Sequence, residues 1–118
     1  MSTRATVHFQ YDGNTDAIVY RHSDGYPEGL GKDLKAFFET VKYQCQGTMG
    51  GTRFDDPCYL AAKFVVWQAD KYSKEDLTGS LNFLGVGVCL EDPCDIQYRY
   101  ILECADDEPP KITIEKMG

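Results

Sequence analysis

Ligand recognition is the chemistry for which this sequence offers the most suitable residues. Three arginines stand close to aromatic residues along the chain: Arg21 precedes Tyr26 in the same loop, Arg53 directly precedes Phe54, and Arg99 lies between two tyrosines. The guanidinium fork binds phosphate through paired hydrogen bonds, and aromatic faces stack on nucleobases. These residues would suit a nucleotide that carries a pyrophosphate. The alternative is that Tyr26 packs in the core and that the arginines pair with surface carboxylates.

The loop that begins at Arg21 is the clearest candidate for such a site. Residues 21–27 (Arg-His-Ser-Asp-Gly-Tyr-Pro) place a cation, an imidazole, a carboxylate and an aromatic ring at the end of an expected strand. Loops of this kind commonly carry functional side chains because the scaffold holds them in place. Gly29 and Gly31 then lead into an expected helix, whose unpaired N–H groups suit an anion. The simpler interpretation is that Asp24 and Gly25 only form a turn.

Covalent and metal chemistry have weaker support. A cysteine nucleophile needs a base near it, and His8 and His22 could approach one of the five cysteines. However, Cys58 and Cys89 lie in apolar stretches, where a free cysteine behaves as a small buried hydrophobe. The cysteine spacing does not match the CxxC pairs of zinc sites, and nineteen carboxylates single out no acid–base pair. We therefore expect no catalytic residue, no metal and no cofactor.

Hydrophobic patterning predicts a single α+β domain over residues 1–118. Period-two alternation predicts the strands and a 3.6-residue period predicts the helices, and Asp56 followed by Pro57 is typical of a helix start. The first helix should expose Asp33, and the apolar stretch 81–90 should be a buried central strand. The expected fold is an antiparallel sheet of about five strands packed on a pair of helices, in the order ββααβββ. The expected strands cover residues 5–11, 17–22, 81–90, 95–104 and 111–116, and the helices cover 30–41 and 57–71.

Composition narrows the class of partner. The formal net charge of −7 over 118 residues disfavours a nucleic-acid polymer, which attracts proteins through lysine and arginine. No apolar run approaches the roughly 20 residues that a membrane-spanning helix needs. The N-terminal residues lack the apolar stretch of a secretory signal. Five cysteines cannot all pair within one chain, so we expect a reducing, cytoplasmic setting without a disulfide scaffold.

Two stretches resemble small proteins of phages and prophages. Residues 20–31 (Tyr-Arg-His-Ser-Asp-Gly-Tyr-Pro-Glu-Gly-Leu-Gly) are similar to a signature R-H-[WS]-D-G-Y-P that is followed by G-x-G and a helix. Residues 52–62 (Thr-Arg-Phe-Asp-Asp-Pro-Cys-Tyr-Leu-Ala-Ala) also resemble that group. One branch of the group is the anti-Thoeris family of anti-defence proteins. Ser23 stands where tryptophan is frequent in the signature, which removes a stacking ring at that position.

The resemblance implies a sponge for a signalling nucleotide. It implies that a homo-oligomer built from dimers captures a glycocyclic ADP-ribose intact in the host cytoplasm, and so counters a bacterial anti-phage defence. It also implies roles for individual residues: phosphate contacts from Arg21, Arg53 and Arg99, base stacking by Phe83 or Tyr26, and ribose contacts from Asn82 or Asp24. Two alternatives remain open at this point. One is an acidic protein that inhibits a host enzyme by binding it, and the other is a phage accessory domain of another kind.

Overall fold

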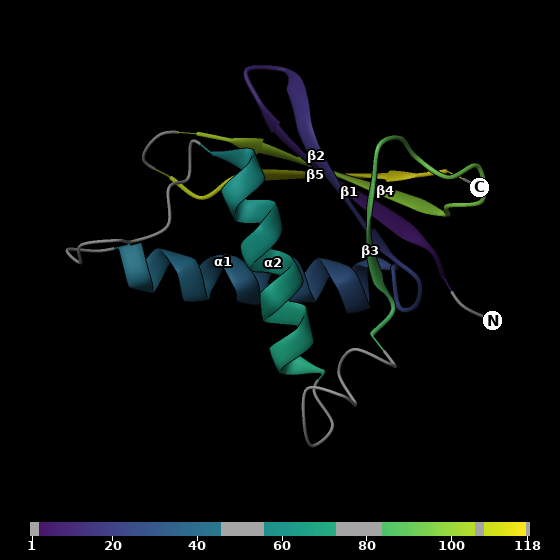
Figure 1. The fold of residues 1–118 in the computed structure, drawn as a ribbon, viewed down its shortest axis with the longest axis horizontal. Coiled ribbons are helices and arrows are strands. Elements are labelled where there is room, and N and C mark those ends of the chain that lie inside the picture. Colours follow the sequence, from purple (N-terminus) through teal and green to yellow (C-terminus); the bar gives the residue numbers. More distant parts are fainter. Residues whose placement is uncertain (1–2, 46–55, 73–83, 106–107, 118) are drawn as a thin grey trace.

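The computed structural model describes residues 3–45, 56–72, 84–105 and 108–117. It is an α+β fold in which a five-stranded sheet packs against two helices (Figure 1). The chain forms the strands β1 (Ala5–Tyr11), β2 (Asn14–Arg21), β3 (Val86–Cys89), β4 (Tyr98–Cys104) and β5 (Lys111–Lys116). A single π-helical turn, η1 (Pro27–Gly31), leads into the helix α1 (Lys32–Cys45), and the second helix is α2 (Pro57–Lys71).

The first hairpin and the start of α2 confirm two sequence predictions. β1 and β2 pair in antiparallel fashion around a turn at Asp12 and Gly13, which both have positive φ angles, of 54° and 80°. At the second helix, the Asp56 carboxylate accepts a hydrogen bond from the backbone N–H of Tyr59 at 3.3 Å, and Pro57 occupies the first helical turn. The positive φ angles close the hairpin turn, and the Asp56 carboxylate binds an N–H group that has no partner within the helix.

The sheet is mixed, and this corrects the prediction of an antiparallel sheet. Its strand order is β3-β2-β1-β4-β5, and β1 and β4 run parallel. The prediction of a buried central strand over residues 81–90 was also wrong. β3 covers only Val86–Cys89 and lies at one edge of the sheet, with Val88 76% exposed. The continuous apolar run is typical of a buried strand, but here the apolar side chains at its end face solvent.

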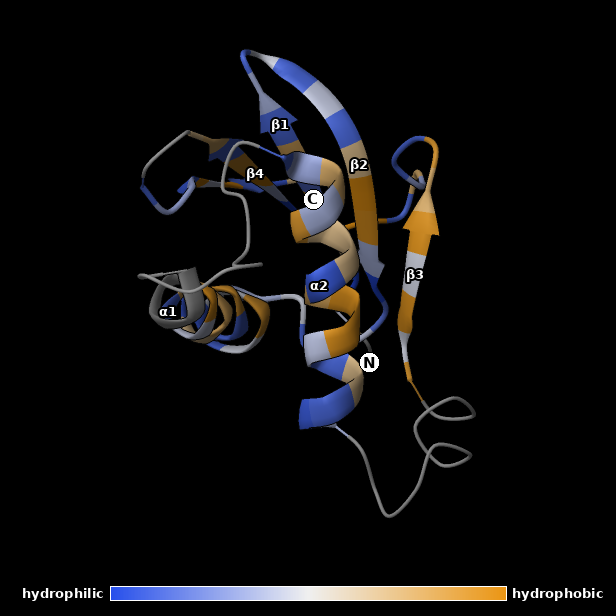
Figure 2. Cartoon of the chain, turned by 60° about the vertical axis from the view of Figure 1, so that its left-hand side comes forward, coloured by the Kyte–Doolittle hydropathy of each residue, from blue (hydrophilic) through white to orange (hydrophobic). Residues whose placement is uncertain are grey.

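The core lies between the sheet and the two helices. Side chains alternate between faces along a strand, so Val7 and Phe9 of β1 point to the helices together with their β4 partners Tyr100 and Leu102. Figure 2 shows the hydrophobic sides of α1 and α2 turned inward. The helices meet through aromatic rings, and the core residues that they contribute are Leu30, Leu34, Phe37, Phe38, Val41, Leu60, Ala61 and Phe64. None of the described helices is long and apolar enough to cross a membrane.

The opposite face of the sheet is crossed by the chain between β3 and β4. β3 and β4 both run parallel to β1, so residues 90–97 must pass over β2 and β1. The crossing residues cover Thr6, which is fully buried although it points away from the helices, and Ile96 of the connection is itself buried.

Candidate functional site

The loop after β2 owes its shape to close backbone packing. Gly25 donates its N–H to the carbonyl of Thr3 at 2.9 Å, and a Cβ placed on Gly25 would lie only 2.7 Å from the Cβ of Ala5. The Tyr100 hydroxyl donates to the Gly25 carbonyl at 2.6 Å. Asp24 has a φ of 55°, and its carbonyl accepts the N–H of Leu30 at the end of η1. The glycine of the Asp-Gly-Tyr-Pro motif is thus required by packing against β1.

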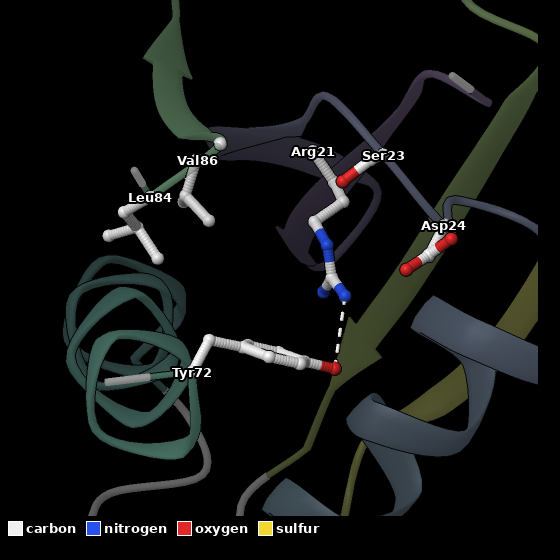
Figure 3. Close-up of a pocket in the computed structure, with 7 residues that line it drawn as sticks. Arg21, Ser23, Asp24, Tyr72, Leu84 and Val86 are labelled. Atoms are coloured by element: carbon white, nitrogen blue, oxygen red, sulfur yellow. Dashed lines mark hydrogen bonds between the residues drawn. The ribbon is translucent and has the colours of Figure 1, made fainter. Parts of the chain in front are cut away.

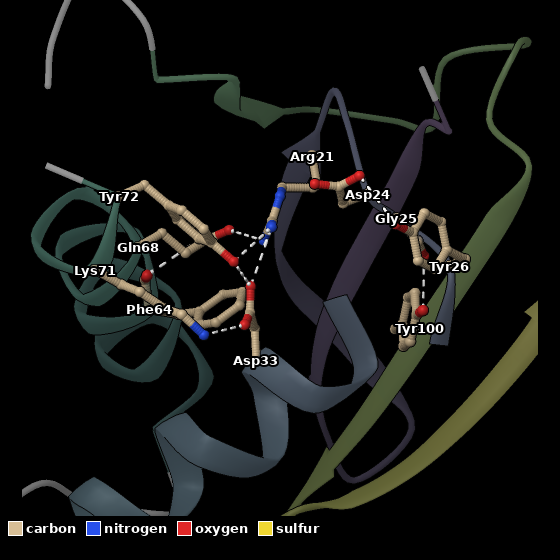
Figure 4. A network of polar contacts seen from close by, with 10 residues as sticks. All are labelled: Arg21, Asp24, Gly25, Tyr26, Asp33, Phe64, Gln68, Lys71, Tyr72 and Tyr100. Atoms are coloured by element: carbon tan, nitrogen blue, oxygen red, sulfur yellow. Dashed lines mark hydrogen bonds and ion pairs between the residues drawn. The ribbon is translucent and has the colours of Figure 1, made fainter. Parts of the chain in front are cut away.

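Arg21 lies in a buried ion-pair network on the helix-covered face of the sheet (Figure 4). Its guanidinium donates to Gln68 Oε1 at 2.8 Å, to Asp33 Oδ2 at 3.0 Å and to the Tyr72 hydroxyl oxygen at 3.2 Å. Lys71 Nζ donates to the other Asp33 oxygen at 2.7 Å. We refer to these five residues as the Arg21 network. Asp33 was expected on the exposed face of the first helix, but its side chain is buried because it neutralises Arg21.

The Asp33 carboxylate stays charged in this setting. Burial alone would raise its pKa, but hydrogen bonds from Lys71, Tyr72 and Arg21 outweigh burial and hold the pKa of Asp33 below its ordinary value. The pKa of Lys71 is raised, mainly by its hydrogen bond to Asp33. The network therefore contains two cations and one anion, and it keeps one surplus positive charge close to the protein surface.

A cavity of about 170 Å³ opens beside this network (Figure 3). Tyr72 forms one wall, with the Arg21 guanidinium 5.0 Å from the centre of its ring. The remaining walls come from the loop after β2 and from the residues that enter β3, namely Ser23, Asp24, Leu84, Gly85 and Val86. The cavity, which we call the Arg21 cavity, combines a cation, a hydroxyl, a carboxylate, an aromatic ring and an apolar side.

Arg99 belongs to a different cluster on the opposite face of the sheet. It pairs with Thr6 across the parallel strands, and Thr6 points away from the helices. Arg99 donates to Asp92 Oδ2 at 2.8 Å and to Glu115 at 3.1 Å, while Thr6 and His8 bond the other Asp92 oxygen at 2.6 and 2.7 Å. We call these five residues the Asp92 cluster. Burial would raise the pKa of Asp92, but the hydrogen bonds from Thr6, His8 and Arg99 lower it.

The predicted site residues that the structure describes lie on both faces of the sheet. Arg21 and Asp24 line one cavity, whereas Arg99 lies on the opposite face of the sheet, so the two arginines do not meet in one pocket of a single chain. Tyr26 is not a core residue; it is 37% exposed, and its hydroxyl donates to Asp24 at 3.2 Å. The hydrogen bond to Asp24 and the negative charge of that carboxylate raise the pKa of Tyr26. The other candidates, Arg53, Asn82 and Phe83, lie outside the described residues.

Tyr72 and Asp33 are the residues that sequence reasoning missed. Tyr72 follows Gln68 by four residues, a spacing that places both residues on one side of a helix. Only the structure shows that this side meets Arg21 and Asp33, because that contact depends on where the second helix packs.

The cysteines and histidines offer no nucleophile–base pair within the described residues. The Cys89 thiol is half-buried, and burial together with Asp92 raises its pKa, which disfavours the thiolate. Cys58 is exposed, contrary to the expectation of a core cysteine, and its Sγ faces the Asp16 carbonyl at 3.8 Å. His22 Nδ1 lies 3.0 Å from the Tyr20 hydroxyl. The described part of the chain also contains no cluster of side chains that could hold a metal ion.

Comparisons of the chain with protein-family models, with curated proteins and with solved structures gave no match. The functional argument therefore depends on the residues and their arrangement.

Proposed function

We propose that this protein captures a small anionic ligand of the nucleotide class in the Arg21 cavity and holds it without chemical conversion. The observation that carries the proposal is the Arg21 guanidinium in the cavity wall, held beside the Tyr72 ring by its bonds to Gln68 and Asp33. A phosphate group is the natural partner of a guanidinium that packing holds in place. Asp24 and Ser23 at the rim would accept and donate hydrogen bonds to ribose hydroxyls.

The resemblance to the anti-Thoeris family suggests the chemical class of the ligand. In that interpretation it is a cyclic nucleotide derived from ADP-ribose, and the protein acts as a phage-type anti-defence sponge in the host cytoplasm, as a homo-oligomer. The cavity of about 170 Å³ is smaller than the roughly 300–1,000 Å³ of sites that enclose a drug-sized ligand. It would hold one phosphate with its ribose, and the remainder of the ligand would extend past the exposed Tyr26.

Binding without conversion is supported by the state of the ionisable groups. The buried Asp33 and the half-buried Asp92 both have lowered pKa values and are engaged in ion pairs. A general base must reach the proton that it removes and have a pKa near the working pH. Neither carboxylate meets that requirement, and the raised pKa of Cys89 works against a thiolate nucleophile.

A thermal-shift and titration panel tests the proposal. The panel contains ADP-ribose, its cyclic and glycocyclic isomers, NAD, and cyclic di- and trinucleotides, and any bound ligand is released by heating and weighed by mass spectrometry. We expect a saturable rise in melting temperature with an ADP-ribose derivative, because a ligand that binds only the native state stabilises it. The released ligand should have its original mass. Absence of any shift across the panel, or release of an altered mass, would contradict the proposal.

A pair of variants places the ligand in the cavity. Tyr72→Ala removes the ring that forms one wall of the cavity and should weaken binding by about tenfold, since the bound ribose would cover the apolar surface of that ring. Tyr72→Phe is the matched control, because it also loses the hydroxyl contacts to Asp33 and Arg21 but keeps the ring. Equal affinity in both variants would show that the ring does not contact the ligand.

A further inference from the structure

The two edges of the sheet differ in how they are protected. β5, at one edge, carries Lys111, Glu115 and Lys116 and follows two prolines. β3, at the other edge, lies in a stretch from Leu84 to Leu90 that has no charged residue and no proline. Charged side chains and prolines are the usual means by which sheet edges avoid pairing with another chain. Only the β3 edge lacks them.

The backbone of β3 presents hydrogen-bonding groups to the outside. His22 donates its N–H to the Gly85 carbonyl at 2.8 Å, so Gly85 faces β2. In an antiparallel ladder alternate residues direct both backbone groups toward the same neighbour. Gly87 then faces β2 as well, whereas Val86 and Val88 direct their N–H and C=O groups outward. Within the described ranges, no strand pairs with this outer side.

The exposed side chains at this edge are apolar. Val88 is 76% exposed and Leu90, just beyond the strand, is fully exposed. A cleft of about 410 Å³ lies next to Leu90 on the helix-free face, with Ile18, Cys89 and Leu90 in its lining. Exposed apolar side chains beside unpaired strand groups are typical of a surface that another strand covers.

Charge identifies the kind of strand. The cleft is also lined by Asp16 and Glu91, and the structure shows no ion pair for either carboxylate among the described residues, whereas Asp92 beside them pairs with Arg99 and is hydrogen-bonded to His8. A lysine or arginine could lay its aliphatic stem on Ile18 and Leu90 and direct its charge to these two carboxylates. The net charge of −7 would further attract a basic partner.

We propose that the outer edge of β3 and the adjoining cleft bind an extended basic segment of a partner protein by β-strand addition. The added strand hydrogen-bonds to Val86 and Val88, and one of its lysine or arginine side chains enters the cleft between Asp16 and Glu91. This surface is independent of ligand capture in the Arg21 cavity, so either proposal can fail while the other stands.

The test is a selection from a displayed library of random dodecapeptides against the full chain in the absence of nucleotide. Enriched peptides are synthesised, and their affinities are measured by fluorescence anisotropy. We expect sequences in which apolar residues alternate and a lysine or arginine recurs at one position. Failure to enrich any peptide, or enrichment of acidic peptides, would overturn the proposal.

Variants at Val88 test the strand geometry. Val88→Pro removes an outward N–H and should weaken peptide binding at least tenfold, and Val88→Thr, which keeps the N–H and the branched shape, should bind like the wild type. If circular dichroism shows that the proline variant is unfolded, Val88→Lys replaces it. The added positive charge should repel a basic peptide and weaken its binding while the strand stays folded. Unchanged affinity in the folded proline variant, or in the lysine variant, would overturn the proposal.

The cleft and self-association are tested separately. The double variant Asp16→Asn with Glu91→Gln should weaken peptide binding at least threefold, and the effect should shrink at high salt because exposed charges are screened. Unchanged affinity would contradict the placement of a cation in the cleft. Sedimentation of the wild type tests whether a second copy of the chain occupies the edge instead. A dimer that Val88→Pro abolishes would assign the edge to a second copy and overturn the proposal.

Discussion

Asp33 shows how one buried carboxylate organises the candidate site. Helical periodicity places it on the side of α1 away from the apolar residues, yet its side chain is buried because Arg21 and Lys71 approach it from β2 and α2. Burial of a charge is costly unless the partners and their hydrogen bonds are complete. Here both carboxylate oxygens are occupied, so the position of Arg21 at the cavity depends on Asp33.

Replacement of Asp33 should be strongly destabilising. Asp33→Asn leaves the Arg21 guanidinium without its counter-charge, and removal of one partner from a buried pair typically costs about 3–5 kcal/mol. The free energy of unfolding, measured by urea titration, reports the effect. Asp70→Asn is the matched control, because Asp70 is exposed on α2. A loss below about 1 kcal/mol in Asp33→Asn would show that the network contributes little.

The pH dependence of stability should follow the two ion-paired carboxylates, Asp33 and Asp92. Asp33 and Asp92 have pKa values below the ordinary carboxyl value in the folded state. Their contribution is therefore complete above the ordinary carboxyl pKa and is lost as the pH falls through the lowered folded values. Urea titrations from neutral pH to acid should show this fall, and the fall should be smaller in Asp33→Asn. Stability that rises on acidification would contradict the assignment.

Gly25 should tolerate no side chain. Gly25→Ala would bring a Cβ within 2.7 Å of Ala5 Cβ and 2.8 Å of the Thr3 carbonyl, which requires β1 or the loop to shift. Overpacking of this kind costs about 1–3 kcal/mol. Gly87→Ala provides the control, since its Cβ would meet only Tyr20 at 3.9 Å. Thermal melting of both variants checks the prediction, and equal melting temperatures would contradict it.

At the scale of elements, the sequence predicted the features that depend on neighbouring residues better than those that depend on contacts between distant segments. The β1–β2 hairpin and the start of α2 were predictable because they depend on neighbours in sequence, such as Gly13, Asp56 and Pro57. The parallel pairing of β1 with β4 was not, since it depends on the path of residues 90–97 across the sheet. The edge position of β3 was missed for the same reason.

Asp92 fixes this crossing segment to the sheet. It links residues 90–97 to β1 through Thr6 and His8, and to β4 through Arg99. Asp92→Ala should remove these bonds and leave Arg99 with Glu115 alone, which should destabilise the protein by about 2–4 kcal/mol because charge-assisted bonds are lost. Hydrogen exchange should speed up at Thr6 and across residues 92–97. Wild-type exchange rates in this segment would contradict the role of Asp92, and Glu91→Ala, at an exposed neighbour, is the control.

At the scale of the whole molecule, the sheet separates two polar groups that look alike in sequence. Arg21 and Arg99 both lie on strands near aromatic residues, but Arg21 is opposite Ala5 and Arg99 is opposite Thr6, which point to different faces. The candidate site was therefore only partly predictable: Arg21 and Asp24 were identified from the loop, while Tyr72 and Asp33 required the helix packing. The Arg21 cavity is the site for which we propose nucleotide capture.

The most direct test of that proposal is an NMR titration of the uniformly ¹⁵N-labelled protein with glycocyclic ADP-ribose, its cyclic isomer and ADP-ribose. We expect saturable shifts that are largest at the backbone amides of Ser23, Asp24, Tyr72 and Gly85, which line the cavity. Amides beside Asp92 and Arg99, on the other face, should change little. Shifts centred on that face, or no shift with any of the three nucleotides, would contradict capture in the Arg21 cavity.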